Sequence, residues 1–109
     1  MRGTIYYDQG KLDQAVSDYS QAITIKPQEP QGYMSRALIY LRESKANEAI
    51  SDLNTVLAID PNNSRAYFNR AVGYFQLKQY DRSWSDVHKT QDLRGTLNPD
   101  FITALKQAK

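Results

Sequence analysis

Apolar residues recur along the chain at the three- and four-residue spacing of amphipathic helices, and proline and glycine punctuate the pattern. From Leu12 to Ile25 this spacing is unbroken. Pro27 and Pro30 end that stretch, because proline lacks an amide hydrogen and clashes with the preceding helical turn. The whole pattern predicts seven helices and no strand, over residues 1–9, 12–25, 31–43, 46–59, 64–77, 80–93 and 99–109.

Residues typical of helix ends stand between these stretches. We expect Gly10 to close the first helix, and Gly95 to adopt the left-handed conformation just past the sixth. Asn63 or Ser64 can cap the helix that follows. We expect Asn98 to cap the last helix. Pro99 and Asp100 follow it, and both residue types are favoured in the first turn of a helix.

The sequence nearly repeats itself after 34 residues. Four series follow this period: Tyr6, Tyr40 and Tyr74; Arg2, Arg36 and Arg70; Asp18, Asp52 and Asp86; Pro27 and Pro61. Self-similarity at such a period predicts a solenoid, in which each pair of helices buries its apolar face against the next pair.

Small and aromatic residues in this register resemble the tetratricopeptide repeat family. The first repeat supplies Gly3, Tyr6, Ala15, Tyr19, Ala22 and Pro27; the second Tyr33, Ala37, Tyr40, Ala49, Leu53, Val56 and Pro61; the third Tyr67, Ala71, Tyr74, Ser83, Val87 and Thr90. The third repeat then departs from the pattern, with Gly95 where a turn proline would stand.

The resemblance implies an all-α fold, a right-handed α-solenoid of antiparallel helix pairs. We expect one domain over residues 1–109, with repeats at about 1–29, 30–63 and 64–97 and a capping helix at 99–109. The first repeat lacks the opening turn of its first helix. A degenerate last repeat followed by an amphipathic helix suits the polar end that such a stack needs.

In this family the first helices of the pairs line a concave groove that holds a peptide. Two apolar stripes with i, i+4, i+7 spacing lie on the expected first helices: Met34, Leu38 and Leu41 on one, and Phe68, Val72 and Phe75 on the next. They are either packing between neighbouring helices or the floor of the groove. The candidate peptide-binding residues are Met34, Leu38, Leu41, Arg42, Arg65, Phe68, Asn69, Val72 and Phe75, within a rim that also includes Gln31, Ser35 and Gln76. Of these, the two phenylalanines are the expected anchors.

One subfamily binds the C-terminal carboxylate of chaperones through lysines, asparagines and an arginine. The matching positions here hold Thr4, Ser35, Arg65 and Asn69, and a fifth lies before Met1. Only Arg65 keeps the charge. The resemblance therefore argues against a chaperone clamp, although Arg65 can still meet an acidic group of a partner.

The periodic small and charged residues have a structural interpretation. Small residues, Gly3, Ala15, Ala37, Ala49, Ala71 and Ser83 among them, allow close helix approach. A feature present in every repeat belongs to the stacking, so we expect Asp18 to pair with Arg36, and Asp52 with Arg70, across successive repeats.

Composition and charge exclude several classes of function. The net charge is +2, and the basic residues form no cluster for nucleic acid or membrane surfaces. The chain has no cysteine, and its longest apolar run, Ala37 to Leu41, is far too short to span a membrane. His88, the one histidine, has no evident metal-ligand or nucleophile partner. We expect no enzymatic activity, cofactor or metal, and the cellular compartment is left open, with the cytoplasm only slightly favoured.

The sequence therefore predicts a protein-interaction scaffold that holds a peptide of another protein, with apolar anchors and an acidic group as the expected ligand features. A first alternative is a self-associating segment of a longer solenoid, because the shortened first helix leaves a hydrophobic end. A second is RNA binding by helical repeats. The apolar stripes and the small net charge speak against RNA.

Overall fold

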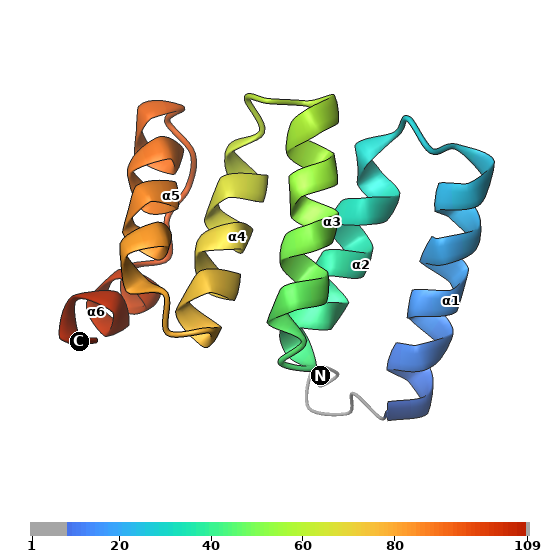
Figure 1. The fold of residues 1–109 in the computed structure, drawn as a ribbon, viewed down its shortest axis with the longest axis horizontal. Coiled ribbons are helices and arrows are strands. Elements are labelled where there is room, and N and C mark those ends of the chain that lie inside the picture. The colour runs from blue at the N-terminus through green and yellow to red at the C-terminus, as the bar shows by residue number, and fades with distance from the viewer. Residues whose placement is uncertain (1–8, 109) are drawn as a thin grey trace.

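The computed structural model describes residues 9–108, which form six α-helices and no strand (Figure 1). The helices are α1 (Gln9–Ile25), α2 (Pro30–Arg42), α3 (Ala46–Ile59), α4 (Ser64–Gln76), α5 (Tyr80–Asp92) and α6 (Pro99–Gln107). The all-helical prediction is confirmed for this part of the chain, with six helices in place of the seven expected. The helix expected over residues 1–9 lies outside the described residues, apart from Gln9. None of the six helices is long and apolar enough to cross a membrane.

Two predicted helix boundaries were wrong. Gly10 does not close a helix, because α1 begins at Gln9 and continues through Gly10 to Ile25. Pro30 is the first residue of α2, where the missing amide hydrogen is no loss. Pro30 therefore begins α2, and of the two prolines only Pro27 acts as a helix terminator, two residues after the end of α1 at Ile25.

The helices follow one another across the molecule from α1 to α6, with α3 in front of part of α2 in the view of Figure 1. Helices α2 and α3 pack as an antiparallel hairpin, and α4 and α5 form a second one. Helix α3 also packs against α4, α1 packs against α2, and α2 touches α4 directly. Of the predicted apolar stripe on α4, Val72 packs against the core cluster that contains Met34 and Leu41 of α2.

Small residues lie where the helices approach most closely. Four of the expected ones have no exposed surface: Ala37, Ala49, Ala71 and Ser83. The Ser83 hydroxyl donates to the Ala71 carbonyl at 2.8 Å, so the polar atom is satisfied inside the core. Ala15 is half-buried, and Gly3 lies outside the described residues.

Helix α6 closes one end of the stack, as the amphipathic pattern predicted. Asn98 caps it, since its side-chain oxygen accepts from the amide of Asp100 at 2.8 Å and of Phe101 at 3.3 Å. Leu105 is 1% exposed and packs with Val87 of α5. The apolar face of α6 therefore covers the last hairpin.

The predicted arginine–aspartate pairing was wrong by one partner. Arg36 pairs with Asp52, not with Asp18, at 2.8 Å and 2.7 Å from its Nε and Nη2 atoms. Arg70 likewise pairs with Asp86, not with Asp52, at 2.8 Å for both contacts. Each pair joins the two helices of one hairpin, 16 residues apart.

The third guanidinium nitrogen of each arginine reaches the previous repeat. Arg36 Nη1 donates to Ser20 Oγ at 3.0 Å, and Arg70 Nη1 donates to Asn54 Oδ1 at 2.8 Å. The hydrogen bonds with Asp52 and Asp86 raise the pKa of these two arginines, against an opposing effect of burial. The expected link between repeats thus exists, but its acceptors are neutral side chains.

Candidate functional site

Two of the three residues of the predicted α2 stripe pack between helices. Met34 and Leu41 of α2 are 8% and 9% exposed and belong to the main core cluster. The Asn69 amide donates to the Met34 sulfur at 3.5 Å, and the Gln76 amide donates to the Leu41 carbonyl at 3.0 Å. These contacts join α2 to α4, so Met34 and Leu41 present almost no surface to a ligand.

The stripe on α4 is partly covered by α6. The ring centroids of Phe68 and Phe75 each lie 5.4 Å from that of Phe101, in edge-to-face arrangements. Phe75 also packs on Tyr80 at 5.7 Å, and Val72 lies against the main core cluster. The capping helix therefore occupies much of the surface that the sequence alone leaves open for a peptide.

Four predicted residues still meet in one open cleft, which we name the α2–α4 cleft. It has a volume of about 560 Å³ and lies between α2, the first turns of α4 and the segment that joins α5 to α6. Its lining residues are Leu38, Ser64, Arg65, Phe68, Asn69, Arg94, Gly95, Thr96 and Asn98. Arg42, at the end of α2, is exposed and lies outside this lining.

The joining segment enters the cleft through an unusual turn. Arg94, not Gly95, adopts the left-handed conformation after α5, with φ of 59°, so the sequence prediction for Gly95 was wrong. The amide of Gly95 donates to the Thr90 carbonyl at 2.8 Å and completes the helix end. A Cβ atom at Gly95 would lie 2.5 Å from Ser64 Cβ. Glycine is needed here because the chain passes directly over the start of α4.

The side chains that line the α2–α4 cleft are apolar on one part and cationic on another. Leu38 and Phe68 are half-buried and offer carbon surface, whereas Arg65 and Arg94 are exposed. Within residues 9–108 neither arginine has an ion-pair partner. Asparagine amides add neutral hydrogen-bonding groups. This combination suits an apolar side chain next to an acidic group.

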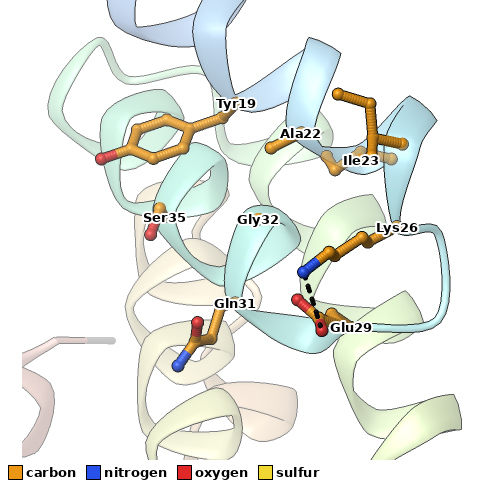
Figure 2. Close-up of a pocket in the computed structure, with 9 residues that line it drawn as sticks. Tyr19, Ala22, Ile23, Lys26, Glu29, Gln31, Gly32 and Ser35 are labelled. Carbon is orange, nitrogen blue, oxygen red and sulfur yellow. Dashed lines mark ion pairs between the residues drawn. The ribbon is translucent and has the colours of Figure 1, made fainter.

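A second cleft lies between α1 and α2 (Figure 2). It has a volume of about 420 Å³, and Tyr19, Ile23 and Ser35 are among its lining residues. Ile25 at its edge is 75% exposed, the one large hydrophobic residue that stands out in this way in the described part of the chain. Lys26 and Glu29 form an ion pair of 3.8 Å at its mouth, which Figure 2 shows.

A third cleft, between α4 and α5, is lined by titratable side chains that include Asp86, His88 and Asp92. His88 is exposed, with its ring 5.9 Å from that of Trp84. Within residues 9–108 no group of three or more histidine and acidic side chains is arranged to hold a metal ion. The geometry therefore directs attention to the first two clefts.

Sequence reasoning missed the joining segment. Arg94, Thr96 and Asn98 follow no periodic pattern, and they enter the cleft only because the chain turns back over α4 after Gly95. One signal was available: glycine stands at position 95, where a third turn proline would continue the repeat. A break in the period marked the place, but it did not show where the chain would go.

Comparisons with protein families give two overlapping matches. A family model described as TPR repeat matches residues 3–44, and a second, described as tetratricopeptide repeat, matches residues 34–83. Among the curated proteins, no significant match is found.

Solved structures with the same arrangement are tetratricopeptide repeat domains. The first such domain of Spaghetti (RPAP3), bound to the HSP90 peptide SRMEEVD, is 27% identical with a TM-score of 0.83, over 97% of this chain and 86% of that one. The first domain of human RPAP3 is 27% identical with a TM-score of 0.84, over 97% and 85%. The TPR2B domain of yeast Sti1, in complex with an Hsp70 peptide, is 27% identical with a TM-score of 0.74, over 84% and 73%.

Proposed function

The chain belongs to the tetratricopeptide repeat family, and from this premise we propose that it is a non-enzymatic scaffold that binds a segment of another protein in the α2–α4 cleft. Domains of this family are in general interaction modules without catalytic activity. The observation that carries the proposal is the convergence of Leu38, Arg65, Phe68 and Asn69, chosen from sequence as peptide-binding residues, in one open cleft.

The cleft offers what a short peptide segment requires. A side chain seated on Leu38 and Phe68 buries apolar area, which provides most of the affinity of such contacts. Asn69 and Arg65 can hold the backbone or a polar group of the segment in register. Met34 is buried and its sulfur accepts from the Asn69 amide at 3.5 Å, so it supports one lining side chain from the core.

Similar structures support a peptide as the ligand. Two of the domains described above were solved with chaperone peptides, which supports a peptide as the ligand of this architecture. The clamp positions of this chain are mostly neutral, however, with Ser35 and Asn69 beside the single cation Arg65. We therefore propose a partner other than the chaperone C-termini.

The proposed architecture is a right-handed solenoid. In it, α2 with α3 and α4 with α5 are the repeats of residues 30–63 and 64–97, α1 belongs to a first repeat at about 1–29, and residues 99–109 cap the stack. This arrangement puts α2 and α4 on the concave side, where the α2–α4 cleft opens.

A pair of matched substitutions tests the proposed function. Wild type, Leu38→Glu and Ile25→Glu are each used to select from a phage-displayed random dodecapeptide library. Both variants place a carboxylate on an aliphatic position, one in the α2–α4 cleft and one at the α1–α2 cleft. We expect wild type and Ile25→Glu to enrich the same peptides, and a Leu38→Glu variant with unchanged circular dichroism to lose them. No enrichment by wild type, or loss with Ile25→Glu alone, would contradict the proposal.

Self-association is the second candidate, and the α1–α2 cleft favours it. Ile25 is 75% exposed, beside the half-buried Ile23 and Tyr19. Association with a second copy, or with a further helix pair, would cover this apolar surface. Molar mass measured by light scattering over a concentration series decides this, because a constant monomer mass eliminates self-association.

A further inference from the structure

The α2–α4 cleft differs in charge from three other clefts in the described part of the chain. Those three clefts have cationic lining and each include a carboxylate: Glu29 beside Lys26, Asp81 beside Lys78 and Arg82, and Asp86 and Asp92 beside Arg70 and Lys89. The α2–α4 cleft is lined by Arg65 and Arg94 and by no acidic residue. Two cations that share a cleft without a counter-charge create a positive potential there, which favours the binding of an anionic group.

We propose that Arg94 is a specificity-determining residue, which with Arg65 binds the side-chain carboxylate of an aspartate or glutamate inside the partner segment. The inference rests on the proposed function and names the ligand chemistry of the same cleft. An apolar residue of the segment occupies the surface of Leu38 and Phe68, and the acidic residue lies beside it, between the two guanidinium groups. Hydrogen bonds between a guanidinium and a carboxylate are directional and charge-assisted, so they select the acid over its amide.

The fold fixes the backbone from which Arg94 projects. On the side of α5, the Gly95 amide donates a hydrogen bond to the Thr90 carbonyl at 2.8 Å, and the Arg94 amide donates to the Gln91 carbonyl at 2.9 Å. On the other, Gly95 lies against Ser64 with no room for a side chain. After two more residues, Asn98 caps α6. A short segment held at both ends presents Arg94 at little further cost in entropy on binding.

An internal acidic side chain fits this cleft better than a chain terminus. Recognition of a terminal carboxylate in this family uses cationic clamp positions on the first helices, and here Ser35 and Asn69 are neutral. The two cations that line the cleft are Arg65 of α4 and Arg94, and Arg94 comes from the joining segment and not from a first helix.

The backbone conformation of Arg94 allows its side chain to be removed without destabilising the fold. Its φ of 59° is one that glycine adopts freely, so Arg94→Gly removes the side chain while it relieves the backbone. Lys78 provides the matched control, with φ of 61°, an exposed cationic side chain and a place outside the cleft. Lys78→Gly makes the same change of charge and of backbone preference elsewhere.

The experiment selects peptides from the phage-displayed random dodecapeptide library. Every peptide is fused to the coat protein through its C-terminus, so none has a free terminal carboxylate. With wild type and with Lys78→Gly we expect enrichment of an acidic residue near an aromatic or aliphatic one. With Arg94→Gly the apolar preference persists and the acidic preference disappears. An unchanged acidic preference with Arg94→Gly, or apolar enrichment without acid from wild type, would overturn the inference and leave the proposed function standing. No enrichment from wild type would overturn both.

Affinity then measures the size of the effect. Fluorescence anisotropy with the most enriched peptide should show Arg94→Gly to bind about tenfold more weakly, and Lys78→Gly within about twofold of wild type. Replacing the acidic residue of the peptide by its amide should weaken wild type about as much and leave Arg94→Gly nearly unaffected, because the two changes remove the same contact. Equal losses in both proteins would mean that Arg94 does not meet the acid.

Discussion

Arg70 and Asp86 form a two-point ion pair inside the last hairpin, with Nε and Nη2 each 2.8 Å from a carboxylate oxygen. Arg36 and Asp52 repeat the geometry one period earlier. The Asp86 side chain is 5% exposed, so its charge depends on the arginine for compensation. The rings of Tyr67 and Tyr74 lie 5.5 Å and 5.8 Å from the guanidinium carbon of Arg70 and hold it in place.

Removal of Arg70 should destabilise the protein without a direct effect on the cleft. Arg70→Ala leaves the buried Asp86 carboxylate unpaired, so we expect the free energy of unfolding to fall by roughly 2–3 kcal/mol. Urea denaturation monitored by circular dichroism measures the change. The double variant Arg70→Met/Asp86→Leu removes both charges and should recover most of the loss. A change below about 0.5 kcal/mol for Arg70→Ala would contradict a structural role for the pair.

Gly95 should be intolerant of a side chain. The Cβ of alanine would lie 2.5 Å from Ser64 Cβ and 2.6 Å from Ser64 Oγ, so the joining segment must move away from α4. We expect Gly95→Ala to lose roughly 1–3 kcal/mol of stability, measured by thermal unfolding. Ser64→Gly removes the two nearest obstructing atoms and leaves Thr90 Cγ2 at 2.9 Å, so the double variant should be more stable than Gly95→Ala alone. Strict additivity of the two substitutions would show that the predicted contact is absent.

Phe101 should link the capping helix to the stack. Its ring lies 5.4 Å from those of Phe68 and Phe75, so Phe101→Ala leaves a gap beneath α6. We expect a loss of about 2 kcal/mol and faster hydrogen exchange throughout α6. Thr103→Ala on the exposed side of α6 is the control and should exchange like wild type. Unchanged exchange in Phe101→Ala would mean that other contacts hold α6.

Most of the fold was predictable because the same pattern of small and aromatic residues recurs three times in the sequence. Ala37 and Ala71 recur at one period and both are fully buried, as expected of residues at close helix contacts. What the period did not determine was pairing: Asp52 is near enough in sequence to serve either Arg36 or Arg70. Only the placement of the helices shows that the hairpin partner, 16 residues away, is chosen.

The candidate site was predicted in part. Leu38, Arg65, Phe68 and Asn69 meet in the cleft because they share the exposed side of α2 and α4. Met34 and Leu41 looked equivalent in sequence, yet they face the neighbouring repeat, since a helix in a stack has two apolar sides. Arg94 could not be found from sequence, because its place depends on a turn that breaks the period.

The central claim is that a partner segment occupies the α2–α4 cleft. Titration of the ¹⁵N-labelled protein with the most enriched display peptide, followed by ¹H–¹⁵N NMR spectra, tests it most directly. We predict the largest shifts at Leu38, Arg65, Phe68 and Asn69, and little change at Tyr19 and Ile23 of the α1–α2 cleft. Shifts confined to Tyr19 and Ile23, with the α2–α4 cleft unaffected, would contradict the account.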